Sequence, residues 1–301
     1  MLSDETIKKI KESGAKKIFV QIPEGLKMTA ISIAKRLENS GLNVLVSAEP
    51  CYGACDLKDS EAKRLKCDLL LHIGHSNFGL KTEVPVIYEE YKIKYDLEKL
   101  LKKHLKQLEE YKNISLLTTI QFLDSLEGAK MFLENHGKKI VSSGQILGCK
   151  QEAAIKSDKE TDCHLFIGSG LFHPIGILEK TKKPVLFLDI ETETIKDLTS
   201  ERNKMLIKRQ LRIEKAKDCK IFGILVSTKP GQSNPRLAET IKKKLERKGK
   251  EAYILVMDEI TPEKILGIKV ECLVNTACPR ISGDSKRFGK VILSSEDVDF
   301  V

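Results

Sequence analysis

Short apolar runs alternate with amphipathic segments along the whole chain. The run at residues 18–22 is followed by a helical pattern over about 27–40 and then by a second run at 43–47. Apolar runs of about four to eight residues predict buried strands, whereas apolar spacings of about three to four residues predict helices. Gly41 ends the second predicted helix, where a C-terminal glycine is usual. The pattern predicts an α/β protein built on parallel sheets.

The same order of elements occurs three times. The predicted strands lie at 18–22, 43–47, 68–73, 84–88, 114–119, 140–143, 164–167, 185–189, 221–226, 252–257, 273–274 and 291–294. The predicted helices lie at 3–13, 27–40, 59–66, 97–111, 203–216 and 235–248, with a further helix ending at Gly137. We therefore expect three homologous Rossmann-like domains with short parallel sheets, at residues 1–92, 93–190 and 191–301.

The chain has eight cysteines, and no short spacing between them is typical of a secreted disulfide framework. This pattern favours metal or redox chemistry, or buried thiols. Four of the cysteines open predicted strands: Cys67, Cys163, Cys219 and Cys272. A thiol at the start of a core strand most simply fills space as a small apolar side chain, which is the interpretation we adopt for these four.

Cys55, Cys149 and Cys278 each follow the carboxyl end of a predicted strand, one in every unit. Open parallel sheets bind ligands at this end of their strands. If the three turns converge on a pseudo-threefold axis, their thiolates suit a central 4Fe-4S cluster, because three irons are ligated and the fourth stays open. Zinc fits less well, since it prefers local ligand pairs and Cys51 with Cys55 is the one close pair.

Short motifs add a family resemblance to this pattern. They are Pro23-Glu24-Gly25-Leu26, Cys-Tyr-Gly-Ala-Cys-Asp (51–56), His72-Ile73-Gly74-His75-Ser76, Gly-Gln-Ile-Leu-Gly-Cys (144–149), Thr228-Lys229-Pro230-Gly231-Gln232 and Asn-Thr-Ala-Cys-Pro-Arg (275–280). Through these motifs, from about residue 18 to 282, the chain resembles the diphthamide-synthesis family of 3-amino-3-carboxypropyl transferases, of the archaeal type. The C-x3-C-x2-C motif of the usual radical S-adenosylmethionine enzymes does not occur in the sequence.

The resemblance implies that Cys55, Cys149 and Cys278 ligate a 4Fe-4S cluster between three similar domains, in a homodimer. Its open iron would bind S-adenosylmethionine, and the bond from sulfur to the γ-carbon would break to give a 3-amino-3-carboxypropyl radical. An electron donor is needed, but no catalytic residue beyond the cluster. The fragment would be added to a histidine of translation elongation factor 2, the first step of diphthamide biosynthesis. Cys51 is a second thiol in the first turn, and the family position after Gly-Ala favours Cys55.

Three further residues are candidates for binding S-adenosylmethionine. Lys229 and Gln232 lie between the first strand and helix of the third unit, where backbone amides can hold a carboxylate. Arg280 is two residues beyond Cys278. The alternative interpretation is turn geometry and a surface charge. His75 and His173, each after a third strand, either line the cleft or cap loops, and we expect neither to be a general base.

The net charge of +9 is compatible with an RNA or ribosomal partner. However, the lysines recur inside helical patterns, as at 241–248, where they form a solvated face. Aromatic residues are 5% of the chain and tryptophan is absent, which argues against base stacking. The longest apolar runs are strand-sized, so we expect a cytoplasmic protein with no membrane contact and no direct nucleic-acid partner.

Two other functions stay open. A quinolinate synthase-like 4Fe-4S dehydratase has the same expected architecture, and architecture alone does not decide function. The motifs ending in Cys55 and Cys149 favour the transferase. The second alternative is a basic RNA- or ribosome-binding protein with incidental thiols, which would contain no iron.

Overall fold

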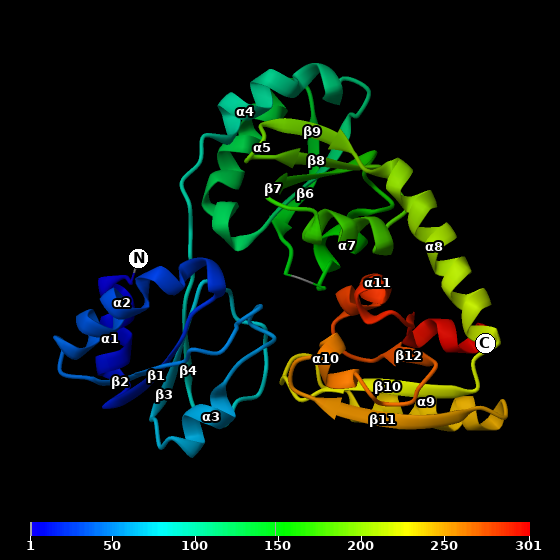
Figure 1. Ribbon diagram of the computed structural model, residues 1–301. Coiled ribbons are helices and arrows are strands. Elements are labelled where there is room, and N and C mark those ends of the chain that lie inside the picture. Colours follow the sequence, from blue (N-terminus) through cyan, green and yellow to red (C-terminus); the bar gives the residue numbers. More distant parts are fainter. Residues whose placement is uncertain (1, 148) are drawn as a thin grey trace. The chain divides into compact units, whose positions relative to one another are not determined.

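The computed structural model describes residues 2–147 and 149–301. Within these residues the strands form three sheets (Figure 1). The chain divides into two compact units, residues 1–202 and 203–301, and the first unit holds two of the sheets. The predicted α/β class with three parallel-sheet units is confirmed, whereas the domain boundaries near residues 92 and 190 stay a prediction.

The first sheet has the strand order β2-β1-β3-β4, with all neighbours parallel. Its elements are α1 (Asp4–Glu12), β1 (Lys17–Gln21), α2 (Ala30–Glu38), β2 (Asn43–Val46), α3 (Asp59–Arg64), β3 (Leu69–Ile73) and β4 (Val86–Glu89). Ile18 and Val20 belong to the core beneath α1 and α2, while Phe19 between them belongs to the core beneath α3. Helices therefore cover both faces of this sheet, as Figure 1 shows.

The second sheet has the order β6-β5-β7-β8-β9, and β9 is its one antiparallel strand. Its elements are α4 (Leu97–His104), β5 (Asn113–Thr118), α5 (Leu126–Asn135), β6 (Lys139–Gln145), α6 (Glu152–Ser157), β7 (Cys163–Gly168), α7 (Phe172–Lys180), β8 (Val185–Asp189) and β9 (Thr194–Asp197). Leucines of α4 and α5, among them Leu101 and Leu133, bury the face that carries Leu116 and Leu165.

The third sheet repeats the order of the first, as β11-β10-β12-β13, again with parallel neighbours. Its elements are α8 (Thr199–Lys217), β10 (Ile221–Ser227), α9 (Pro235–Arg247), β11 (Glu251–Met257), α10 (Pro262–Ile265), β12 (Cys272–Asn275), α11 (Ser285–Phe288) and β13 (Val291–Ser294). Short 3-10 helices lie at Glu24–Thr29, Leu105–Leu108, Ile120–Ser125, Pro279–Asp284 and Ser295–Phe300. No described helix combines the length and the apolar character needed to cross a lipid bilayer.

One carboxylate joins the first and third strands at the same place in every sheet. Asp68, Asp162 and Glu271 each precede the third strand directly and accept two backbone N–H groups at the start of the first strand. The N···O distances are 2.8 and 2.8 Å for Asp68, 3.0 and 2.7 Å for Asp162, and 2.5 and 3.3 Å for Glu271. We call this bond pair the strand clamp. Its recurrence supports the predicted internal triplication.

Some short elements were not expected from the sequence. The pattern predicted neither the polar strand β9 nor the helices α6, α7, α10 and α11. In α7, Pro174 and Gly176 interrupt the helical signal, although Pro174 lies in the first turn, where proline is tolerated. The predicted helix at 27–40 begins as a 3-10 turn and becomes α-helical only at Ala30.

The interpretation of the strand-opening cysteines is confirmed for two and wrong for two. Cys67 and Cys163 are buried thiols. Cys219 and Cys272 instead form a disulfide, with their Cα atoms 6.2 Å apart. β10 and β12 are adjacent and parallel, with Phe222 paired to Cys272. Cys219 lies three residues before Phe222, near enough to the start of β12 for a disulfide.

The stabilising effect of the strand clamp should depend on pH. The two N–H groups lower the pKa of the Asp162 carboxyl below its ordinary value, because they bind its charged form. Its stabilising effect is therefore complete above the unfolded-state pKa, about 3.9, and is lost as the pH falls through the lower folded-state pKa. Asp162→Ala should lower the thermal midpoint by a few degrees at pH 7, and this difference should shrink once the pH falls below the unfolded-state pKa of about 3.9.

Differential scanning calorimetry from pH 7 to pH 3 tests this. The control is Asp218→Ala, which removes an exposed acid from the loop before β10. Asp162→Asn keeps an acceptor oxygen and should recover part of the midpoint without the acid titration. A midpoint difference for Asp162→Ala that persists unchanged at pH 3 would contradict the clamp as a charge-dependent interaction.

Candidate functional site

The strand order gives each sheet a topological switch point. The chain crosses from β1 outward to β2 and later from β3 outward to β4, so the direction of winding reverses between β1 and β3. Ligands of open α/β sheets bind at such a switch point, beyond the carboxyl ends of the strands. The motifs at residues 23–26 and 72–76 lie at this edge of the first sheet, immediately after β1 and at the end of β3.

The turn that carries Cys51 and Cys55 is held by the last residue of β1. The Gln21 side chain is buried; its Nε2 donates to the Asp56 carbonyl at 2.6 Å, and its Oε1 accepts the Lys58 N–H at 3.2 Å. These two bonds fix which end of the amide is the acceptor. Cys51 is buried, whereas Cys55 is half-buried.

A hydrogen-bond chain continues from Gln21 through two histidines. His72 Nδ1 lies 3.1 Å from Gln21 Oε1, and His72 Nε2 lies 3.0 Å from His75 Nδ1. Since Gln21 Oε1 is an acceptor, His72 donates from Nδ1 and presents a lone pair at Nε2. Burial lowers the pKa of His72 to about 3 and that of His75 to about 4, so both imidazoles are neutral at physiological pH.

The same histidines approach a thiol. Cys51, His72 and His75 each offer one ligand atom, and these atoms lie within 4.8 Å of one another. Of the residues in this hydrogen-bond chain, the sequence had indicated His75 as a candidate, but neither Gln21 nor His72. The available signal was a polar residue, Gln21, within the apolar run at 18–22, with a His-x-x-His spacing at the end of a later strand.

Cys149 lies in an exposed turn after β6. Leu147 and Lys150 bridge this turn through their backbones, with N···O distances of 3.2 and 2.5 Å. The turn contacts the segment that follows His75: Gln145 Nε2 donates to Ser76 Oγ at 2.9 Å, and Lys150 Nζ donates to the Phe78 carbonyl at 2.6 Å. The structure therefore connects the Cys149 turn to the motif at the end of β3, within the first unit.

Cys278 is half-buried in the loop after β12. Asn275, the last residue of that strand, shapes the loop: its Nδ2 donates to the Cys278 carbonyl at 2.8 Å and its Oδ1 accepts the Ala277 N–H at 3.0 Å. Cys55 and Cys149 follow the second strands of their sheets, whereas Cys278 follows the third strand of its sheet. Convergence of the three thiols stays a prediction, because Cys278 belongs to the second compact unit.

Lys229, Gln232 and Arg280 share one edge of the third sheet. Lys229 and Gln232 follow β10, and Arg280 follows β12, the strand paired with β10. Lys229 is buried, and its N–H donates to Ser227 Oγ at 3.2 Å; Arg280 is exposed. The structure thus brings these three candidates to the switch point of one sheet, beside the loop of Cys278. His173 packs against Phe172 and Phe166 instead.

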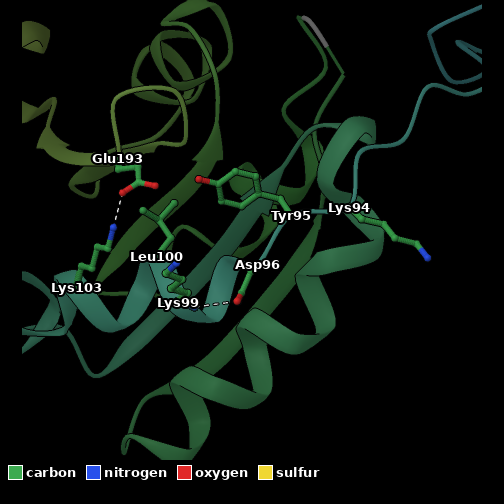
Figure 2. Close-up of a pocket in the computed structure, with 7 residues that line it drawn as sticks. All are labelled: Lys94, Tyr95, Asp96, Lys99, Leu100, Lys103 and Glu193. Atoms are coloured by element: carbon green, nitrogen blue, oxygen red, sulfur yellow. Dashed lines mark hydrogen bonds and ion pairs between the residues drawn. The ribbon is translucent and has the colours of Figure 1, made fainter.

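A shallow pocket in the second sheet's layer does not contain these candidates. Figure 2 shows its lining, Lys94, Tyr95, Asp96, Lys99, Leu100, Lys103 and Glu193. Lys103 forms an ion pair with Glu193, Asp96 caps α4 by accepting the Lys99 N–H, and Lys94 points away from the other side chains. The lining is mostly charged, and these residues form no recognisable catalytic grouping.

Comparison with known proteins gives consistent matches. The family model described as "Putative diphthamide synthesis protein" matches residues 22–301. The chain is 36% identical to the 2-(3-amino-3-carboxypropyl)histidine synthase of Pyrococcus horikoshii, over 99% of this chain and 89% of that protein. It is 33% identical to subunit 1 of the Aspergillus fumigatus synthase, over 93% of this chain and 65% of the fungal protein.

Solved structures agree with these sequence matches. The crystal structure of Dph2 from Pyrococcus horikoshii matches with a TM-score of 0.92 and 35% identity, covering 98% of this chain and 88% of that chain. The crystal structure of the same protein with a 4Fe-4S cluster matches with a TM-score of 0.91, also at 35% identity, covering 99% of this chain and 90% of that chain.

Thiol reactivity tests the cysteine environments. In reduced, metal-free protein at pH 8, iodoacetamide should modify the exposed Cys149 rapidly and Cys163 very slowly. Cys163 is fully buried, and burial raises its pKa to about 12, so its reactive thiolate is scarce. Peptide mass analysis over time measures both rates, and denatured protein, in which both thiols should react alike, is the control. Equal rates in the folded protein would contradict the described environments.

Proposed function

The chain belongs to the diphthamide synthesis family, and from this membership we propose that it catalyses the first step of diphthamide biosynthesis, as a 2-(3-amino-3-carboxypropyl)histidine synthase. The observation that carries the proposal is the 36% identity to the Pyrococcus horikoshii synthase along 99% of the chain. The family match also favours the transferase over the quinolinate synthase-like dehydratase and over an RNA-binding protein.

A 4Fe-4S cluster is the proposed cofactor, and Cys55, Cys149 and Cys278 are its proposed ligands. The related Dph2 structure with this cluster supports the cofactor. The three thiols fit the group chemically, because iron–sulfur clusters take thiolate ligands and all three side chains are at least partly accessible, in turns after strands. When bound, the cluster would supply the electron that cleaves S-adenosylmethionine between sulfur and the γ-carbon.

The chain's own residues would bind and orient S-adenosylmethionine. Lys229 and Arg280 are the proposed partners of its carboxylate, because cations at a switch point attract an anionic group. The turn at Lys229 and Gln232 is closed by a hydrogen bond from the Gln232 N–H to the Lys229 carbonyl at 2.9 Å. These contacts would select which carbon–sulfur bond of the sulfonium centre is cleaved, because the orientation of the bound cofactor determines which bond faces the cluster.

The proposed protein substrate is translation elongation factor 2, which would receive the 3-amino-3-carboxypropyl group on a histidine carbon. We place this reaction in the cytoplasm, where the factor acts, with a homodimeric enzyme and a separate electron donor. The family resemblance supports the dimer and the donor.

Iron analysis of single variants tests the ligand set. Cys149→Ala and Cys278→Ala should lose most of their iron after anaerobic reconstitution, because each removes one of three thiolate ligands. Cys55→Ala should behave likewise, while Cys51→Ala keeps its iron. The matched controls are Cys67→Ala and Cys163→Ala, which remove buried thiols at the opposite strand ends and should cost stability only. Normal iron and normal activity in Cys149→Ala would exclude the triad.

The nucleoside product tests the reaction itself. The reaction contains reductant, S-adenosylmethionine and elongation factor 2, without oxygen. Chromatography should show methylthioadenosine, and mass analysis should show an aminocarboxypropyl group on one histidine of the factor. Without the factor or the reductant, the modified histidine should be absent. If 5'-deoxyadenosine is the main nucleoside, the proposed orientation of S-adenosylmethionine is wrong. If quinolinate forms from iminoaspartate, the protein is the quinolinate synthase-like dehydratase instead.

A further inference from the structure

A second group of candidate metal ligands lies in the first sheet, and it includes none of the three proposed cluster thiols. We propose that Cys51, His72 and His75 bind one Zn²⁺ ion. Their ligand atoms lie within 4.8 Å of one another, and they come from two segments, the turn after β2 and the end of β3. This site does not depend on the proposed catalytic function.

The spacing of the two imidazoles fits a single ion. His72 Nε2 and His75 Nδ1 are 3.0 Å apart. Two nitrogens bound tetrahedrally to zinc at ordinary bond lengths are about 3.3 Å apart, and a sulfur and a nitrogen about 3.6 Å. The histidines therefore need only a small displacement, and the Cys51 sulfur, which lies within 4.8 Å of both nitrogens, would move closer to take the third position.

A hydrogen bond to Gln21 fixes the orientation of His72. Histidines that bind metals usually donate their other ring N–H to a fixed acceptor, which sets the tautomer and the ring orientation. Gln21 Oε1 is that acceptor here, and the Asp56 carbonyl and the Lys58 N–H fix the Gln21 amide in turn. His72 is fully buried, yet it keeps the tautomer that presents a lone pair at Nε2 toward His75.

Zinc binding at this site requires no proton donor or acceptor other than these side chains and solvent. The proton between the two rings belongs to His75 Nδ1, because His72 Nε2 is the acceptor. On zinc binding this proton moves to His75 Nε2, the usual exchange between neutral tautomers. The Cys51 thiol, which contacts the Gly53 carbonyl at 3.9 Å, releases its proton to solvent. Binding thus releases one proton per ion, as expected for a thiolate ligand.

The donor set favours zinc over other common cations. One thiolate and two neutral imidazoles are the nitrogen and sulfur ligands that zinc prefers, whereas Mg²⁺ and Ca²⁺ require oxygen. Three protein ligands leave a fourth position for water or another small ligand. A bound ion would also tie the turn that carries Cys55 to the end of β3. This assigns Cys51 a role that differs from that of Cys55.

The test uses reconstituted protein with its iron–sulfur cluster, so that the cluster thiols are occupied and do not bind zinc. Zinc is added alone, excess is removed by gel filtration with a weak chelator, and zinc and iron are measured in the same sample. X-ray absorption at the zinc edge should show one sulfur at about 2.3 Å and two nitrogens at about 2.0–2.1 Å. We expect one zinc per chain beside about four irons.

Variants separate the two metals. Cys51→Ala and His75→Gln should lose zinc and keep iron, whereas Cys67→Ala and His104→Gln, the matched controls, should keep both. Gln21→Ala leaves all three ligands in place and should weaken zinc binding by about 10–100-fold. His75 is half-buried, so His75→Gln is informative even if changes at buried His72 prevent folding.

Three results would overturn the proposal. They are no zinc retained by the reconstituted wild type, full zinc retention in both Cys51→Ala and His75→Gln, and loss of iron from Cys51→Ala, which would make Cys51 a cluster ligand. Failure of the catalytic proposal would appear differently, as a wrong nucleoside product with normal zinc content.

Discussion

Parallel pairing of the first and third strands is the constraint on which each sheet depends. The pairs β1 with β3, β5 with β7 and β10 with β12 lie at the centre of their sheets. A carboxylate binds the two strands at their amino-terminal ends, at Asp68, Asp162 and Glu271. Because strand register is then set, the loops at the opposite ends have fixed neighbours. The candidate metal ligands and cofactor-binding residues lie in or next to those loops.

The amino-terminal ends stabilise the fold, and the carboxyl ends carry the candidate sites. In the first sheet the carboxyl edge brings together Gln21, His72 and His75, and in the third it brings Lys229 and Arg280 beside the Cys278 loop. Helices pack against the faces of the sheets, and the candidate sites lie at the carboxyl edges. The same edge carries different side chains in each repeat, because the loop residues differ.

The strands could be predicted well from the sequence because a short, continuous apolar run between turn residues is typical of a strand buried on both faces. Strand β9 was missed because Thr194–Asp197 is a polar edge strand, and α7 was missed because packing of Ile177 and Leu178 outweighs a weak local helix signal. The pairing of Cys219 with Cys272 required the strand order, which periodicity does not contain. Likewise, the bond between Gln21 and His72 joins residues 51 positions apart. The family motifs, by contrast, were visible locally.

The position of the disulfide has a consequence for sulfur chemistry in the third sheet. Strand β12 begins at Cys272, which is cross-linked to Cys219, and the loop after its other end carries Cys278. At about 3.3 Å per residue, the strand alone separates the two ends by about 10 Å. A thiolate must approach a disulfide sulfur directly to exchange with it. Cys278 is therefore kept out of reach of the cross-link, so a sulfur available for ligation and an oxidised sulfur pair lie at opposite ends of β12 and should not exchange.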